Sequence, residues 1–171
     1  MKDKKLPEYW LRGKIEGTPD LLQPVAHSLM QSREELKRYM EDFPDEQLWE
    51  KPAGRASVGF HLQHLTGVLD RLFTYAKGEN LNEEQLRALK SEGVANEALT
   101  SKLLIEKFEE KVRDVLKELE NFPVAGLTDF RGVGRKQLPT TVIGLLFHAA
   151  EHSQRHIGQL LVTVSVLKSK V

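Results

Sequence analysis

The sequence predicts an all-α protein that folds as a four-helix bundle. Four stretches carry apolar residues at the spacing of an amphipathic helix, and no strand pattern of real length is found. The chain has 171 residues, which suits one domain with a sizeable core. Packing four such helices together buries their apolar stripes. We therefore expect a single bundle domain over residues 1–171, with a long connection between the third and fourth helices and one or two short extra helices.

The first helix is expected over residues 19–41. Pro24 falls in its opening turns, where proline is tolerated best. After one short turn over residues 45–49, the second helix is expected to begin at Ser57, a good N-cap, and to end near Lys77. The apolar stripes are Leu22, Ala26, Leu29, Leu36, Met40 and Phe43 in the first helix, and Val58, Leu62, Leu65, Leu69, Leu72 and Phe73 in the second.

A short amphipathic helix is expected next, because Asn82 and Gln85 have the spacing of a capping box and Gly93 closes the segment. The third long helix is expected from about Thr100 to Asn121. Its stripe is strongly helical and consists of Leu104, Phe108, Val112, Val115 and Leu119.

Residues 122–139 form the long connection, which suits a crossover or a loop over one end of a bundle. Residues 128–138 within it are compatible with a short hairpin. The fourth helix is expected to begin after Pro139, with Thr140 or Thr141 as its cap, and to end near Leu167.

Composition argues against several classes of function. The chain has 25 basic and 25 acidic side chains, so it lacks the basic excess that is typical of a nucleic-acid binder. It has no cysteine, which excludes disulfides, thiolate ligands and a cysteine nucleophile. The N-terminal stretch lacks the apolar core of a signal peptide, and no apolar run is long enough to span a bilayer. We expect a cytoplasmic protein that acts on a small molecule, without nucleic acid or membrane partners.

The stretch “LLFHAAEHSQRHIGQLL” places His148, His152 and His156 at intervals of four residues. On a helical wheel these histidines share an arc with apolar and small residues, so they are expected to face the bundle interior. A buried histidine needs partners for its ring nitrogens. Two imidazoles at i and i+4 can reach one metal ion. Because each step of four turns the side chain by about 40°, His148 and His156 diverge by about 80° and are not expected to share one ion.

The second helix carries His61 and His64 on adjacent turns. His61 lies within the apolar arc and His64 at its edge, so the wheel leaves the choice open and favours His61 if either. One of them with two histidines of the last helix would form a nitrogen-only site that suits zinc, nickel or another borderline divalent ion. Three protein ligands leave at least one coordination position open, as in catalytic sites.

“SVGFHLQHL”, followed far downstream by “HAAEHSQRHIGQL”, resembles the DinB/YfiT-like superfamily of metal-binding four-helix bundles, the damage-inducible proteins rather than the polymerase of that name. The match is carried by Ser57, Gly59 and His64, and by His152, His156, Gly158 and Gln159. The N-terminal “YWLRGKIEGTPDLLQPVAHSL” is similar to a bacterial subgroup. The resemblance implies the metal ligands His64, His152 and His156. It leaves His61 and His148 as neighbours whose N–H groups bond nearby.

The resemblance also implies a function. Members of the superfamily include thiol S-transferases that use low-molecular-weight thiols and proteins described as metal-dependent hydrolases. A divalent ion on three neutral imidazoles lowers the pKa of a water or thiol, to about 7 for zinc-bound water. Zinc or nickel is expected first, with manganese or iron as alternatives, and a low-molecular-weight thiol as a further cofactor. The other interpretation is a non-catalytic bundle with a structural or regulatory metal or ligand. A homodimer is compatible with such helices.

Two further groups are considered from the sequence. His27 on the first helix is expected as a hydrogen-bonded boundary residue that could line the cavity. Arg131, Arg135 and Lys136 precede the fourth helix and could flank the pocket mouth, where they would favour an anionic substrate.

Overall fold

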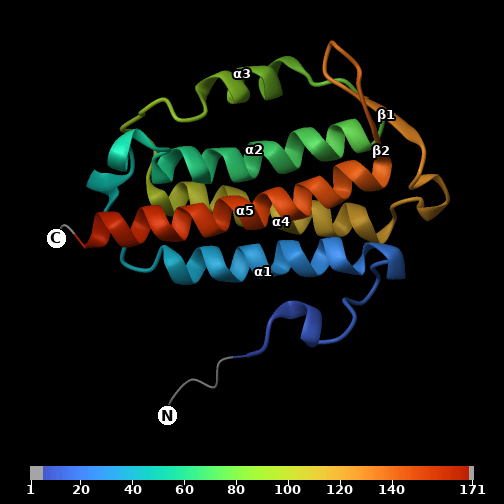
Figure 1. Cartoon of the computed structure of the whole chain (residues 1–171), viewed down its shortest axis with the longest axis horizontal. Helices are drawn as coiled ribbons and strands as arrows, with labels where there is room; N and C mark the ends of the chain where they lie inside the picture. The colour runs from blue at the N-terminus through green and yellow to red at the C-terminus, as the bar shows by residue number, and fades with distance from the viewer. Residues whose placement is uncertain (1–5, 170–171) are drawn as a thin grey trace.

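The computed structural model describes residues 6–169, and four long helices build its bundle (Figure 1). These helices are α1 (Gln23–Tyr39), α2 (Val58–Ala76), α4 (Ser101–Glu120) and α5 (Val142–Lys168). α5 packs against α1 and α2, and α4 packs against the same two helices from the other side. The four helices thus enclose one core of leucine, valine, alanine and phenylalanine side chains, with Phe73 and Phe108 the largest that are fully buried. The predicted all-α bundle is confirmed.

The start of α2 follows from three residues in its first turn and the loop before it. Ser57 caps the helix, because its side-chain oxygen accepts a hydrogen bond from the backbone N–H of Phe60. Gly59 donates its N–H to the carbonyl of Leu48. A Cβ on Gly59 would lie 2.6 Å from Cε3 of Trp49, so only glycine allows this close approach. The loop and the helix are therefore locked together just before the histidine turns of α2.

The first helix begins later than residue 19. A 3-10 turn, Asp20–Leu22, precedes α1, and Leu22 stands at the N-cap with no side-chain hydrogen bond. Pro24 occupies the second position of the helix, where its missing N–H costs nothing. The helix ends at Tyr39, three residues before Asp42, which has a positive φ of 51°. The expected start was too early because residues 20–22 form a separate 3-10 turn before the α-helix.

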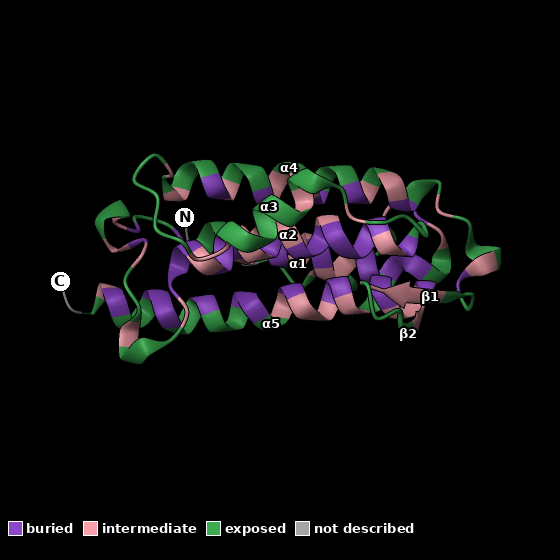
Figure 2. Cartoon of the chain, turned by 90° about the horizontal axis from the view of Figure 1, so that it is seen from above, coloured by how far each residue is buried: buried purple, intermediate pink, exposed green. Residues whose placement is uncertain are grey.

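A short helix, α3 (Glu83–Ser91), lies outside the bundle along α2 (Figure 1). The predicted capping box is present, since Asn82 accepts from the N–H of Gln85 and the Gln85 side chain accepts from the N–H of Asn82. None of its residues is buried, and Figure 2 shows it as mostly exposed. α3 therefore rests on the bundle without belonging to the core.

The long connection between α4 and α5 forms an antiparallel hairpin of two short strands, β1 (Phe130–Val133) and β2 (Leu138–Thr141). Phe130 pairs with Thr141 and Val133 with Leu138. Gly134 at the turn has a φ of 65°, a conformation that glycine adopts at little cost. Thr141 then caps α5 by accepting from the N–H of Gly144. The hairpin thus sets where the last helix begins.

Candidate metal centre

Five of the six histidines gather where α2 faces α5. His61 and His64 come from α2, and His148, His152 and His156 come from α5. α2 and α5 are packed side by side (Figure 1). Because histidines recur at three or four residues on each helix, their rings form a continuous row along this interface, tilted against one another, with neighbouring ring centroids 4.5 to 5.2 Å apart.

The centre of the cluster is formed by His64, His152 and His156. One ring nitrogen from each can be chosen so that all three lie within 4.8 Å of one another. Nε2 of His64 lies 2.9 Å from Nε2 of His152, close enough that one of them must carry a proton directed at the other. His156 is buried and the other two are half-buried. The structure therefore brings together the three residues named by the resemblance.

His61 lies behind His156. Its Nδ1 is 3.0 Å from Nδ1 of His156, and its ring is only 3% exposed. Phe60 stacks on His64 with 5.2 Å between the ring centroids and 13° between the planes. His61 thus contacts one member of the triad, and an aromatic ring fixes the plane of another. The helical wheel left the choice between His61 and His64 open. In the structure, His64 directs Nε2 at His152, whereas His61 directs Nδ1 at His156.

Burial keeps these imidazoles neutral. It lowers the pKa of His61 and of His152 to about 4, with the charge of His64 acting in the same direction. Burial also lowers the pKa of His156 to about 3, aided by the neighbouring histidines. At neutral pH all three are uncharged, and a neutral imidazole is the form that binds a metal ion.

The hydrogen bonds restrict where the ring protons lie. Nδ1 of His64 is 2.7 Å from Oε2 of Glu92, and a carboxylate only accepts, so this nitrogen carries a proton. In the neutral form of the His64 ring, Nε2 carries the lone pair and accepts from Nε2–H of His152. That assignment leaves Nδ1 of His152 as a bare acceptor, and this atom is buried without a partner. The cluster therefore holds a proton between Nε2 of His64 and Nε2 of His152, two of the nitrogens that could bind a metal ion.

Glu92 is itself held by a buried cation. Its second oxygen, Oε1, lies 2.6 Å from Nη1 of Arg71 on α2. Burial alone would raise the pKa of Glu92, but the hydrogen bonds from His64 and Arg71 outweigh burial and leave that pKa below its usual value. Glu92 is thus an ionised acceptor for the ring of His64. Neither Glu92 nor Arg71 was anticipated from the sequence, although Arg71 among buried leucines indicates a buried partner.

His148 lies beside His152 but is bound to a carboxylate of its own helix. Its Nδ1 lies 2.7 Å from Oε1 of Glu151, and Arg155 donates to both oxygens of that carboxylate. Among the described residues, His148, Glu151 and His152 form a second group whose ligand atoms are close enough for a cation. However, Arg155 already neutralises Glu151, and the side chain of His148 is 45% exposed. The buried triad offers the better-shielded set of donors.

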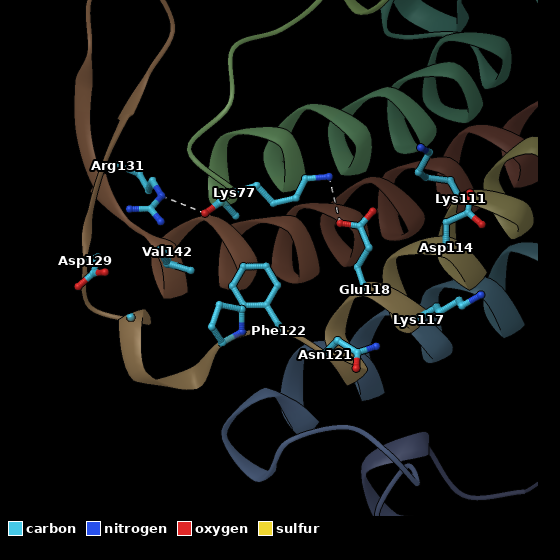
Figure 3. A pocket seen from close by; sticks show the side chains of 13 residues that line it. Lys77, Lys111, Asp114, Lys117, Glu118, Asn121, Phe122, Asp129, Arg131 and Val142 are labelled. Atoms are coloured by element: carbon cyan, nitrogen blue, oxygen red, sulfur yellow. Dashed lines mark hydrogen bonds and ion pairs between the residues drawn. The ribbon is translucent and has the colours of Figure 1, made fainter.

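The remaining candidates lie elsewhere. Nε2 of His27 is 2.8 Å from the carbonyl of Gly13, and its ring lines a small cavity beside the N-terminal segment, away from the triad. Arg131 donates to the carbonyls of Ala76 and Phe130 and lines a cavity of about 950 Å³ at the hairpin end of the bundle (Figure 3). None of the described residues lining that cavity is a histidine. The structure therefore places Arg131 at another cavity, and its expected role at a pocket mouth, with Arg135 and Lys136, stays a prediction.

Fold and site together define a four-helix bundle with an interior histidine cluster that could hold a metal ion. The chain belongs to the DinB superfamily, because the sequence model of that superfamily matches residues 28–160. The matched span includes all five clustered histidines and Glu92. No curated protein matches the chain.

Solved structures support the fold. A conserved protein from Enterococcus faecalis is 17% identical with a TM-score of 0.66, over 85% of this chain and 96% of that one. A protein from Streptococcus pneumoniae is 11% identical with a TM-score of 0.62, over 85% of this chain and 88% of that one. At these identities the likeness concerns the arrangement of helices. Within residues 6–169, no helix is both long and apolar enough to cross a membrane.

Proposed function

We propose that the protein binds one divalent metal ion through His64, His152 and His156 and uses it to activate a water or a low-molecular-weight thiol, as a hydrolase or a thiol S-transferase. The observation that carries this proposal is the convergence of three imidazole ring nitrogens from two helices within 4.8 Å. Two of the rings are kept uncharged by burial, and Glu92 fixes the proton of the third.

The donors fit a borderline divalent ion such as zinc or nickel. Zinc–nitrogen bonds of about 2.0–2.1 Å in tetrahedral geometry place two ligand nitrogens about 3.3 Å apart. The 2.9 Å between Nε2 of His64 and Nε2 of His152 would therefore open by only a few tenths of an ångström. Binding would replace the shared proton, and that proton would move to Nδ1 of His152 or to solvent. Nδ1 of His156 faces His61, so Nε2 of His156 is its free nitrogen.

The chain's own residues shape what such an ion can do. Three protein ligands leave a coordination position for the reactant, and the ion would supply a positive charge that lowers the pKa of a water or thiol there. His148 lies next to His152 on the more exposed side, with ring centroids 4.8 Å apart. That side is where a small molecule would enter. The chain has no cysteine, so a thiol would have to come from the reactant.

Elemental analysis tests the metal site. Protein purified without a nickel column should contain close to one divalent ion per chain, and His152→Ala should lose it while His27→Ala keeps it. His27 is a suitable control because it is a histidine outside the cluster. If His152→Ala contains as much metal as the parent protein, the assignment of His64, His152 and His156 as the metal ligands is refuted.

Turnover separates the enzyme from a non-catalytic bundle. Protein loaded with zinc, nickel or manganese is offered small thiols with chlorinated or epoxide electrophiles, and separately ester and amide substrates. The enzyme reading expects metal-dependent turnover that His64→Ala abolishes. If metal binds stoichiometrically and no metal supports turnover on any of these substrates, the metal has a structural or regulatory role.

A further inference from the structure

We propose that Glu92, held by Arg71, is a positioning residue for the metal centre: it fixes His64 with its proton on Nδ1 and its Nε2 lone pair directed at His152. This inference rests on the proposed metal site. It adds a residue from outside the four-helix bundle, in the turn after α3, to the machinery of a site built on α2 and α5.

The carboxylate bridges a candidate ligand and a buried cation. Oε2 of Glu92 lies 2.7 Å from Nδ1 of His64, and Oε1 lies 2.6 Å from Nη1 of Arg71. The side chain of Glu92 is 7% exposed and that of Arg71 is 10% exposed. With both oxygens engaged and little water present, the carboxylate cannot rotate without losing a charged contact. Metal-ligating histidines commonly donate their other N–H to such a carboxylate, which sets the tautomer and the ring orientation.

A glycine in the middle of α2 makes room for this pair. A Cβ on Gly67 would lie 2.5 Å from Nη1 of Arg71 and closer still to Oε1 of Glu92. Glycine inside a helix is unfavourable relative to alanine. The Glu92–Arg71 pair therefore fills the space beside Gly67.

The next residue anchors the same turn. Gly93 has a φ of 78° and donates its N–H to Oε1 of Gln63, at 2.7 Å. A Cβ on Gly93 would lie 3.0 Å from Cδ2 of Phe60, the ring that stacks on His64. The turn therefore contacts α2 before His64 through Gly93 and after His64 through the Glu92–Arg71 pair.

The short helix before this turn contributes no buried side chain to the core. None of the residues of α3 is buried, and Gln85 ties it to α2 through Asp70 and Thr74. Glu92 is the charged link between its C-terminal end and the site. Because a positioned His64 favours metal binding, bound metal must in turn favour the docked turn. The position of α3 is thereby coupled to occupancy of the centre.

Substitution of Glu92 tests the role through the proton on His64. In Glu92→Gln the amide oxygen faces Arg71 and the NH2 group faces Nδ1 of His64, which forces the His64 proton onto Nε2, the nitrogen needed for the metal. We expect the ¹⁵N shifts of His64 in metal-free protein to change from the Nδ1–H to the Nε2–H pattern. Zinc and nickel affinity should fall roughly 10- to 100-fold. Glu84→Gln is the matched control, because it removes one charge from exposed α3 and should change neither readout.

A second variant leaves every polar group in place. Gly67→Ala should displace Glu92 from His64 and lower zinc affinity roughly 10-fold or more, although alanine favours the helix. Gly158→Ala on α5 is its control, since a Cβ there meets nothing within 4 Å. Hydrogen exchange of α3 and the turn should slow when zinc binds the parent protein, and should respond less in Glu92→Gln.

The outcomes are distinguishable. Folded Glu92→Gln and Gly67→Ala proteins that bind zinc as the parent does, with unchanged His64 shifts, would overturn the positioning role. If the parent itself binds no zinc or nickel, the proposed function fails. The ¹⁵N shifts of His64 in the metal-free variants then still decide whether Glu92 sets its tautomer.

Discussion

His61 and His156 meet nitrogen to nitrogen across the α2–α5 interface, with 3.0 Å between their Nδ1 atoms. Only one of the two can carry the proton in that contact. If His156 binds a metal through Nε2, its Nδ1 carries the proton, so His61 is the acceptor. His61→Phe should therefore leave a buried N–H without a partner and weaken zinc binding roughly 10-fold. Calorimetric titration with zinc checks this, with His27→Phe as control. Unchanged affinity in His61→Phe would mean that His61 only fills space.

The buried histidines make the stability of the metal-free protein depend on pH. Burial lowers the pKa of His61 and His152 to about 4 and that of His156 to about 3, against about 6.5 in an unfolded chain. At pH values between the folded and the unfolded pKa, the unfolded state binds more protons than the folded state does. The free energy of unfolding therefore rises with pH over this range. The stability that depends on the buried histidines being neutral is complete above about pH 6.5 and is lost as the pH falls through about 4.

Urea unfolding at a series of pH values checks this sign. Metal-free protein should lose stability steadily as pH falls from about 7 to about 4.5, and His61→Phe should show a shallower dependence. A free energy of unfolding that stays level over this range would contradict the shielding of the cluster.

Metal should stabilise the folded chain. A ligand that binds only the folded state at 100 times its Kd raises the free energy of unfolding by about 2.7 kcal/mol. We expect a corresponding rise in Tm with zinc, reversed by a chelator and absent in His152→Ala. Scanning calorimetry of the two proteins, with His27→Ala for comparison, measures it. An equal rise in His152→Ala would place the binding elsewhere.

His148→Ala should keep the metal. Nδ1 of His148 is engaged with Glu151, and the side chain of His148 is 45% exposed, against 17% for that of His64. We expect zinc affinity within about threefold of the parent, a difference of about 0.6 kcal/mol. A loss comparable to that of His156→Ala would instead favour the group of His148, Glu151 and His152 as the ligand set.

Gly59→Ala should destabilise the protein. The added Cβ would lie 2.6 Å from Cε3 of Trp49, and such overpacking costs about 1–3 kcal/mol. Gly158→Ala, in open space on α5, should leave stability unchanged or raise it by up to about 1 kcal/mol. Urea unfolding of both variants makes the comparison. If both behave alike, the loop at Trp49 yields to the extra methyl group.

Local patterns were sufficient for most of the fold. The stripe of α4, the cap at Ser57 and the capping box of α3 each depend on residues within one or two turns, and each was predicted from their spacing. The start of α1 was misplaced, because the apolar spacing does not distinguish the helix from the 3-10 turn over residues 20–22 that precedes it. The hairpin of β1 and β2 was only compatible with the sequence, since its pairing joins residues up to eleven positions apart.

The sequence by itself determined the bundle and the inward direction of His152 and His156, because helical periodicity is a property of each segment alone, whereas His148 is 45% exposed. It also pointed to His64, through resemblance to a family rather than through geometry. Only the tertiary structure decided that His64 faces His152, that His61 lies behind His156, and that Glu92 and Arg71 complete the environment of His64. Such contacts join residues 21 to 95 positions apart, and they exist only once the helices pack and the turn after α3 docks.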